Sequence, residues 1–137
     1  MTFLDPLKRA IEADIKILRN SENYQGLEVV VCDDSIVRGG QIKANLVPKL
    51  RKLGIKGIHF RISNPELYSH CLWGKTTKKS ELLANRFPSK KEKINFLKIE
   101  SLEYTTIKNL IKAIGLPTER LCLDCAFLEP LKQKTLF

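Results

Sequence analysis

A chain of 137 residues, 43% of them hydrophobic, can bury one modest core and is too short for two full domains. Its 24 Lys and Arg against 15 Asp and Glu give a net charge of +9, which favours anionic partners, either phosphorylated metabolites or nucleic acid. No stretch approaches the roughly 20 apolar residues that cross a bilayer, and the first residues lack the apolar centre of a secretion signal. We therefore expect a cytoplasmic protein with no membrane partner.

The basic residues are scattered along the chain, and the aromatic residues near them form no repeated stacking pattern of the kind that binds nucleic acid. The sequence also contains no recognisable helix-turn-helix or other reading element. We therefore interpret the positive charge as a solvated, lysine-rich surface and expect no nucleic-acid partner.

The first predicted element is a helix over residues 5–20, in which Pro6 follows the capping residue Asp5. We interpret residues 1–25 as this helix and a linker, of unclear origin. The apolar, β-branched run at 27–32 predicts a strand. Because the run is continuous, we expect a central strand of a parallel sheet, buried on both faces.

A second helix is predicted over residues 41–53, with Pro48 expected to kink or shorten it and Gly54 expected to end it. Residues 57–62 predict the next strand. A strand, a loop, a helix and a second strand in this order form a right-handed parallel unit.

The later elements are shorter. Residues 79–87 predict a short helix, 90–95 are too charged for an assignment, and 97–104 predict a short strand. Thr106 is expected to cap a last helix that Gly115 ends. The alternation predicts an α/β fold with a mainly parallel sheet and flanking helices, in one domain over residues 26–137 that ends in a cysteine-containing tail.

The loop after the first strand carries Asp33 and Asp34 and then small residues that include Gly39 and Gly40. Loop amides and the start of the next helix can receive a phosphate, while the carboxylates accept hydrogen bonds from sugar hydroxyls. Ligands also bind preferentially at strand ends in open α/β sheets. The same residues could instead form an Asx-turn and helix cap without a ligand, and the pattern alone leaves both interpretations open.

The residues of this loop resemble a known signature. VVVCDDSIVRG at 29–39 resembles the phosphoribosyl-pyrophosphate motif of type I phosphoribosyltransferases, and DDSIVRG is the form found in glutamine amidophosphoribosyltransferases. RISNPELYSHCLWG at 61–74, ELLANR at 81–86 and SLEYTTIKNLIKAIGLPTERLCLDC at 101–125 resemble later segments of that family, in the same order. The resemblance covers roughly residues 26–125.

This resemblance implies the C-terminal half of a type I phosphoribosyltransferase fold and the synthesis of 5-phosphoribosylamine from glutamine and phosphoribosyl pyrophosphate, the first committed step of purine synthesis. It also implies that Asp33 and Asp34 are the catalytic pair, which binds the ribose hydroxyls directly or through Mg²⁺. The loop implied to hold the 5-phosphate consists of Ser35, Ile36, Val37, Arg38, Gly39 and Gly40.

The sequence departs from the family at two places. Hydroxyl residues usually follow DDSIVRG, whereas this chain has Gly40 and Gln41, so we expect phosphate binding through the main chain. The family begins with a glutaminase domain whose N-terminal cysteine attacks glutamine, whereas this chain begins Met1-Thr2. We expect a truncated or split form that is inactive alone and that needs a partner chain or a homo-oligomer to supply the missing elements.

Three cysteines, Cys71, Cys122 and Cys125, are candidate ligands for an iron–sulfur cluster or zinc, although either site normally needs four. Without a metal they would be small apolar side chains. One branch of the family holds a 4Fe-4S cluster, and the resemblance implies that these three cysteines occupy three of its ligand positions. The resemblance provides no residue for the fourth position. Cys32 is no substitute, because it belongs to the strand before Asp33. We expect the isolated chain to hold no stable cluster.

Two other functions stay open at this stage. One is a non-catalytic regulator that binds phosphoribosyl pyrophosphate and presents a basic surface to nucleic acid or protein. The other is a zinc-stabilised interaction module built on the three cysteines. A hydrolase is not indicated, because neither His59 nor His70 has a recognisable partner for nucleophilic catalysis.

Overall fold

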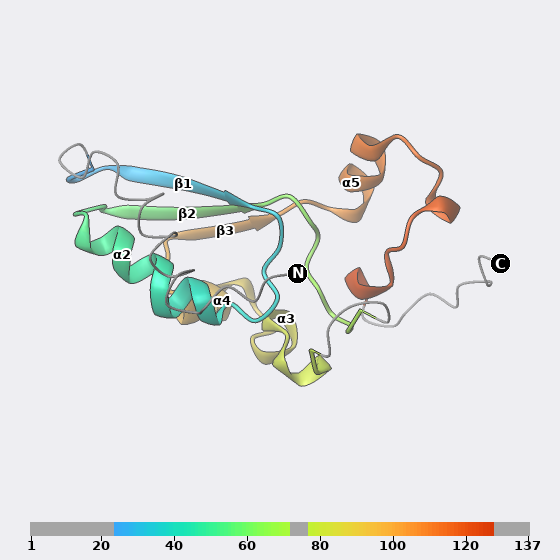
Figure 1. Cartoon of the computed structure of the whole chain (residues 1–137), viewed down its shortest axis with the longest axis horizontal. Helices are drawn as coiled ribbons and strands as arrows, with labels where there is room; N and C mark the ends of the chain where they lie inside the picture. The colour runs from blue at the N-terminus through green and yellow to red at the C-terminus, as the bar shows by residue number, and fades with distance from the viewer. Residues whose placement is uncertain (1–23, 72–76, 128–137) are drawn as a thin grey trace, which may run out of the picture.

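The computed structural model describes residues 24–71 and 77–127 of the chain. In these residues three parallel strands form one sheet in the order β1 (Glu28–Asp33), β2 (Gly57–Ile62) and β3 (Ser101–Tyr104) (Figure 1). The parallel order confirms the predicted α/β class. The helix expected before residue 21 lies outside the described residues.

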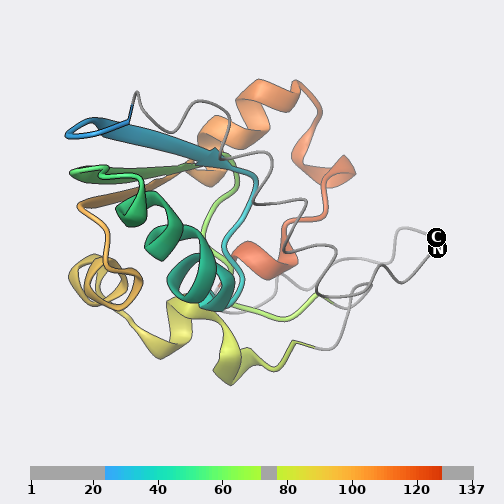
Figure 2. The same ribbon diagram turned by 60° about the vertical axis from the view of Figure 1, so that its left-hand side comes forward.

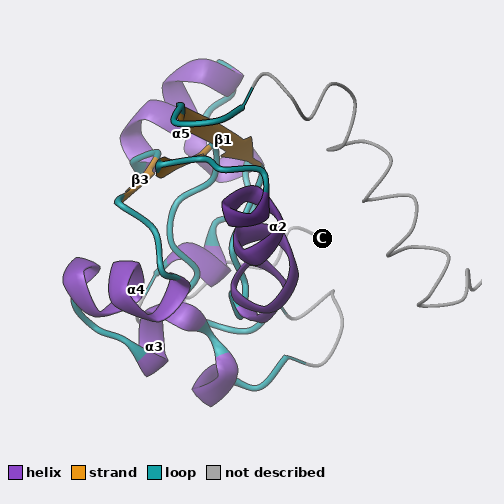
Figure 3. Cartoon of the chain, turned by 90° about the vertical axis from the view of Figure 1, so that its left-hand side faces the viewer, coloured by secondary structure: helices purple, strands orange, loops and turns teal. Residues whose placement is uncertain are grey.

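The helices fall on two sides of the sheet. Figures 1 and 2 show α2 (Val47–Lys52), α3 (Leu83–Arg86) and α4 (Lys90–Leu97) on one side. α5 (Ile107–Ile114) lies beyond the carboxyl ends of the strands, and in Figure 3 the sheet stands between it and α4. None of the described helices is long and apolar enough to cross a membrane. The shorter helical turns are η2 (Ile42–Leu46), η3 (Lys79–Glu81), η4 (Thr118–Arg120) and η5 (Asp124–Ala126).

The core lies between the sheet and α2 and α4. The strand register places Val31, Phe60 and Leu102 side by side on one face of the sheet, and Phe60 and Leu102 are fully buried. Leu97 of α4 is also fully buried, and Val47 of α2 nearly so. Each such side chain stabilises the fold by about 1.5–3 kcal/mol relative to an exposed position.

The expected central position of β1 is wrong for the described residues, where β1 pairs with β2 alone and forms an edge. Val30 is 60% exposed and Cys32 is exposed, because alternate residues of a strand point to opposite faces. The second face of the sheet carries polar side chains next to them, including Glu28 and Arg61. The continuous apolar run therefore identified the strand correctly, but it did not show that one face of the strand is exposed.

The helix after the acidic loop is irregular at the predicted place. Immediately before Pro48 the chain forms the π-turn η2, in which the N–H of Val47 bonds to the carbonyl of Ile42, five residues earlier. Proline lacks an N–H, and its ring clashes with the carbonyl four residues earlier in a regular helix. The wider turn avoids this clash. α2 then runs to Lys52, and Gly54, whose φ is +80°, terminates it.

Helix α4 covers residues 90–95, for which the sequence gave no assignment, and it extends to Leu97, so the strand expected over 97–104 forms only over residues 101–104. The helix begins with a capping box. The Ser89 hydroxyl accepts a hydrogen bond from the Glu92 N–H at 3.2 Å, and the Glu92 carboxylate accepts one from the Ser89 N–H at 2.9 Å. This S-x-x-E signature was present in the sequence and could have identified the helix. The predicted cap of α5 is confirmed, since the Thr106 hydroxyl accepts a hydrogen bond from the Asn109 N–H at 3.1 Å.

Gly39 is the residue of the acidic loop that packs against Leu97 of α4 and Leu83 of α3. Its φ is +71°, and a Cβ atom there would lie 2.9 Å from Cδ2 of Leu97 and 3.2 Å from Cδ1 of Leu83. The loop is also tied to α3 by the hydrogen bond from the Leu83 N–H to the Val37 carbonyl at 2.8 Å. Glycine is therefore required at residue 39 both by the backbone conformation and by packing.

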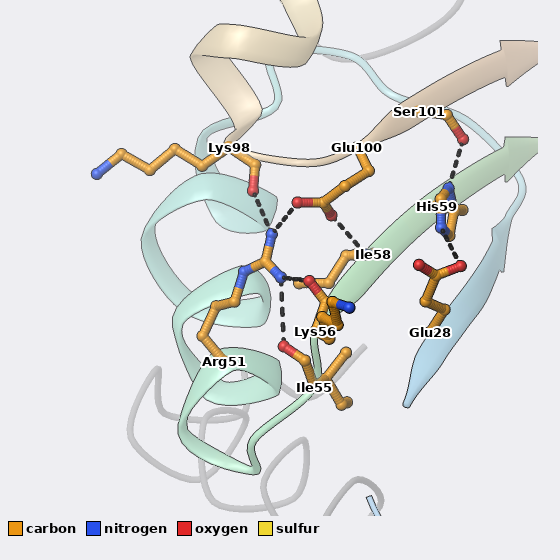
Figure 4. A network of polar contacts seen from close by, with 9 residues as sticks. All are labelled: Glu28, Arg51, Ile55, Lys56, Ile58, His59, Lys98, Glu100 and Ser101. Atoms are coloured by element: carbon orange, nitrogen blue, oxygen red, sulfur yellow. Dashed lines mark hydrogen bonds and ion pairs between the residues drawn. The ribbon is translucent and has the colours of Figure 1, made fainter. Parts of the chain in front are cut away.

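A polar network joins the amino ends of the strands (Figure 4). The Arg51 guanidinium donates to the carbonyls of Ile55, at 3.2 Å, and Lys56, at 2.6 Å, and pairs with the Glu100 carboxylate at 2.6 Å. The other carboxylate oxygen of Glu100 accepts the Ile58 N–H at 2.6 Å. Glu100 thus links the end of α2 to the starts of β2 and β3.

We predict that Glu100→Gln destabilises the protein at neutral pH but not in acid. Burial raises the pKa of Glu100, but the Ile58 N–H and Arg51 outweigh it and hold this pKa below its usual value. A carboxyl with a lowered folded pKa adds stability above its unfolded pKa, and this stability is lost as pH falls through the folded pKa. Urea unfolding should show a loss of about 1 kcal/mol near neutral pH. Equal losses at neutral pH and well below the carboxyl range, or an equal effect of the exposed control Glu119→Gln, would contradict this role.

We predict that Gly39→Ala destabilises the protein by about 1–3 kcal/mol, from the positive φ and the contact with Leu97 together. The matched control is Gly40→Ala, because a Cβ there meets no atom within 4 Å and its φ is not positive. Thermal unfolding of both variants checks the prediction. Similar melting temperatures for the two variants would refute it.

Candidate functional site

The two aspartates lie at the carboxyl end of β1, and both are exposed. Their carbonyls accept the N–H groups of Ser63 and Asn64, each at 3.0 Å, which fixes their backbone to the segment after β2. One oxygen of Asp33 accepts the Asp34 N–H at 2.9 Å, and one oxygen of Asp34 accepts the Ser35 N–H at 2.7 Å. Each of these bonds reaches the next residue, whereas an Asx-turn needs a bond to the residue after that, so neither bond is the Asx-turn of the ligand-free alternative. Each carboxylate keeps a second oxygen for a ligand.

The loop residues 35–40 and Asp33 line one groove, of about 1060 Å³. The first helical hydrogen bond after the loop runs from the Lys43 N–H to the Gly39 carbonyl, at 3.1 Å. The N–H groups of residues 40–42 precede this bond and have no acceptor inside the helix, so they carry the partial positive charge of a helix start. The buried side chain of Ile36 anchors the loop beneath the groove. This arrangement suits an anionic group such as a phosphate.

Arg38 is held at the edge of this loop. Its guanidinium pairs with the Glu81 carboxylate at 2.7 Å, and both side chains are about half exposed. An exposed pair of this kind contributes little stability, so the loop conformation depends mainly on Gly39 and Ile36.

A second hollow, of about 490 Å³, adjoins the aspartates. It lies at the carboxyl ends of all three strands and is lined by Cys32, Asp33, Asp34, Arg61, Ile62, Ser63 and Thr105. Asp33 therefore faces both hollows and Asp34 only this one. Two adjacent carboxylates with free oxygens, beside space for a substrate, fit a Mg²⁺ ion that takes its other ligands from substrate and water.

The three candidate cysteines lie near one another. Burial raises the pKa of the Cys125 thiol, and the nearby Cys71 and Cys122 thiols raise it further. Cys71 and Cys125 line the groove of the acidic loop, whereas Cys122 does not. Across residues 24–71 and 77–127, however, no three His, Cys, Asp or Glu side chains are placed to hold a metal ion. In the described residues the three cysteines are therefore not arranged as a metal-binding group.

His59 has partners that the sequence did not reveal. Its Nδ1 lies 2.8 Å from the Ser101 hydroxyl, and its Nε2 lies 3.7 Å from the Glu28 carboxylate (Figure 4). Arg61 also donates to the Ser101 hydroxyl, at 3.0 Å. His59 and Ser101 are paired in the register, whereas the Glu28–His59 and Arg61–Ser101 contacts are diagonal, each two residues along the strand from the paired position. Together these contacts tie the polar face of the sheet together.

A buried ion pair near the site was also missed. Lys93 is 3% exposed, and its ammonium lies 2.6 Å from Oε1 of Glu66. Oε2 of Glu66 accepts a hydrogen bond from the Tyr68 hydroxyl at 2.6 Å. This bond, with burial, raises the pKa of Tyr68 to about 12. Lys93 occurs in the charged run KKEK, which gives no sign that one of its lysines is buried.

Comparison with known proteins gives a consistent set of relatives. No protein-family model matches the chain. It is 34% identical over 128 residues to the amidophosphoribosyltransferase of Methanocaldococcus jannaschii, a match that covers 90% of this chain and 26% of the relative. It is 32% identical over 126 residues to amidophosphoribosyltransferase 1, chloroplastic, of Arabidopsis thaliana, with 90% and 22% covered. The chain thus spans about a quarter of the length of these relatives, in their C-terminal part.

Two solved structures are similar to the chain. The glutamine phosphoribosylpyrophosphate amidotransferase of B. subtilis, complexed with ADP and GMP, matches with a TM-score of 0.67 and 25% identity, over 96% of this chain and 32% of that one. A structure described as the allosteric regulatory enzyme of purine biosynthesis matches with a TM-score of 0.70 and 28% identity, over 94% and 29%. The chain is therefore homologous over most of its length to the C-terminal part of the amidophosphoribosyltransferases, and it has part of their type I phosphoribosyltransferase fold.

Proposed function

We propose that this chain carries the phosphoribosyl-pyrophosphate-binding half of an amidophosphoribosyltransferase site, which makes 5-phosphoribosylamine in purine biosynthesis. The observation that supports this best is the shared groove, in which Asp33 and the loop 35–40 meet at the start of a helix. Relatives named amidophosphoribosyltransferase match 90% of the chain. The glutamine-dependent half of the reaction needs residues outside those matched here.

In this proposal each end of the substrate has its own contacts. The 5-phosphate binds the N–H groups of residues 40–42, and because Gly40 and Gln41 replace hydroxyl residues, this contact depends on the main chain. The ribose hydroxyls donate to the free oxygens of Asp33 and Asp34. A Mg²⁺ ion bound there would screen the charge of the pyrophosphate leaving group.

In this reaction the main tasks of the protein are to orient the substrate and to stabilise the charge that develops on it. Displacement of pyrophosphate at C1 develops positive charge on the ribose, which nearby carboxylates stabilise. Asp33 and Asp34 have fixed backbones, so their carboxylates are held in place before the substrate binds. Neither acts as a covalent nucleophile in this scheme.

We predict that Asp33→Asn combined with Asp34→Asn abolishes binding of phosphoribosyl pyrophosphate with Mg²⁺ and leaves the melting temperature unchanged within a few degrees. Asparagine has the same shape and can still accept the hydrogen bonds of the turn, but it lacks the charge. Isothermal titration checks this, with ribose 5-phosphate and inorganic phosphate as further ligands. Glu119→Gln, which removes an exposed carboxylate outside both hollows, should bind as the wild type does. No saturable binding by the wild type would overturn the proposed function.

We also propose that Cys71, Cys122 and Cys125 are inherited positions of a 4Fe-4S site that this chain does not complete. A cluster of that type needs four ligands, and the described residues bring only these three thiols near one another.

We predict substoichiometric iron and sulfide, and no visible absorbance, in the chain purified anaerobically. Zinc measured in the same sample tests the alternative that the cysteines hold a structural ion, with Cys122→Ser as the matched variant. Stoichiometric iron and sulfide on the isolated chain would overturn the prediction, and stoichiometric zinc that Cys122→Ser removes would favour a zinc-stabilised module.

A further inference from the structure

The Glu66–Lys93 pair is unusual because its lysine is buried and its glutamate is mostly buried. The two side chains are 20% and 4% exposed. A buried ion pair contributes little net stability, because desolvation of both charges offsets their attraction, and apolar residues of similar volume often serve as well. What such a pair can provide is a defined geometry for the segments it joins.

Glu66 lies in the middle of a segment that is tied down at both ends. At one end, Ser63 and Asn64 donate their N–H groups to the carbonyls of Asp33 and Asp34. At the other end, the N–H groups of Tyr68 and Ser69 donate to the Cys125 carbonyl, at 2.8 and 3.1 Å. Residues 63–69 therefore form a connecting segment, the strap, whose hydrogen bonds reach the acidic pair at one end and Cys125 at the other. Glu66 joins this strap to α4 through Lys93.

The same helix supports the acidic loop from below. Leu97, one turn after Lys93 on α4, is the side chain on which Gly39 packs. Lys93 holds the strap that carries the backbone of the aspartates, and Leu97 holds the phosphate loop. Helix α4 thus supports both the aspartates and the phosphate loop of the proposed ligand site.

Apolar packing alone does not fix the position of Glu66. A cavity of about 360 Å³ adjoins the pair and is lined by Pro65, Glu66, Tyr68, Lys93, Tyr104 and Thr105, among others. This space is an open hollow at the surface, and within it the Glu66 carboxylate is held by its contacts with Lys93 and Tyr68. The Lys93 ammonium is in turn oriented by the Pro88 carbonyl, at 3.4 Å.

We propose that Glu66 and Lys93 are positioning residues for the phosphoribosyl-pyrophosphate site: through the strap 63–69 they set the place of the Asp33 and Asp34 backbone. This inference rests on the proposed function. It adds two residues that touch no ligand and act through Ser63 and Asn64.

The main test variant is Glu66→Gln combined with Lys93→Met, which removes both charges and so leaves no unpaired charge in the core. The control is Glu103→Gln with Lys90→Met, which removes a pair of the same type and the same 2.6 Å separation that also involves α4 but is more than half exposed. Two measurements are made on each protein: hydrogen exchange of the Ser63 and Asn64 amides, and the affinity for phosphoribosyl pyrophosphate with Mg²⁺.

In the main variant we expect faster exchange of both amides and a loss of affinity of about tenfold, with the control close to wild type in both. A purely structural role would lower the melting temperature and leave both readouts of the folded protein unchanged, and that result would overturn the inference. Unchanged affinity despite faster exchange would overturn it as well. If the wild type itself does not bind, the proposed function fails, and the positioning role fails with it.

Discussion

The parallel register of the three strands is the constraint from which the site follows, because it makes Asp33, Ile62 and Tyr104 neighbours where the strands end. At the other end of the sheet, the Glu100 carboxylate joins the Arg51 guanidinium at the end of α2 to the Ile58 N–H of β2, and Arg51 also holds the carbonyls of Ile55 and Lys56. The hollows that carry the acidic residues lie at the carboxyl ends of the strands, where ligands bind preferentially in open α/β sheets.

Local signals in the sequence predicted the elements well where a single residue determines the backbone. Gly54 and Gly115 end their helices with positive φ, Pro48 produces the π-turn, and residues 57–62 form the predicted strand without a shift. Such features depend only on neighbouring residues. The cover of β1 depends on distant segments, so its apolar run predicted a central strand, whereas within residues 24–71 and 77–127 β1 is at the edge of the sheet.

The sequence likewise predicted some residues of the candidate site and missed others. The acidic pair and its loop were found through a resemblance in sequence, because those residues touch the proposed ligand and their types follow from its chemistry. Glu66 and Lys93 were not found, since a lysine between charged neighbours has the same pattern whether it is exposed or buried. The partners of His59 were missed for a related reason: Glu28 and Ser101 come from strands far apart in the sequence, and only the register brings them together.

Stability and ligand binding are coupled to different degrees across this site. Asp33 and Asp34 are exposed and hold only their own turn through side-chain oxygens, so their charge can be removed with little loss of core packing. Gly39 lies on Leu97 and Leu83, so a change there disturbs the core and the phosphate loop together. Glu66 and Lys93 lie between these limits, because their pair belongs to the interior while its effect on the aspartates passes through two backbone hydrogen bonds. A site supported in this way from one helix keeps its geometry only while α4 remains packed against the sheet, and α4 achieves this through Leu97 in the core, with Ile94 and Phe96 packed against the same core.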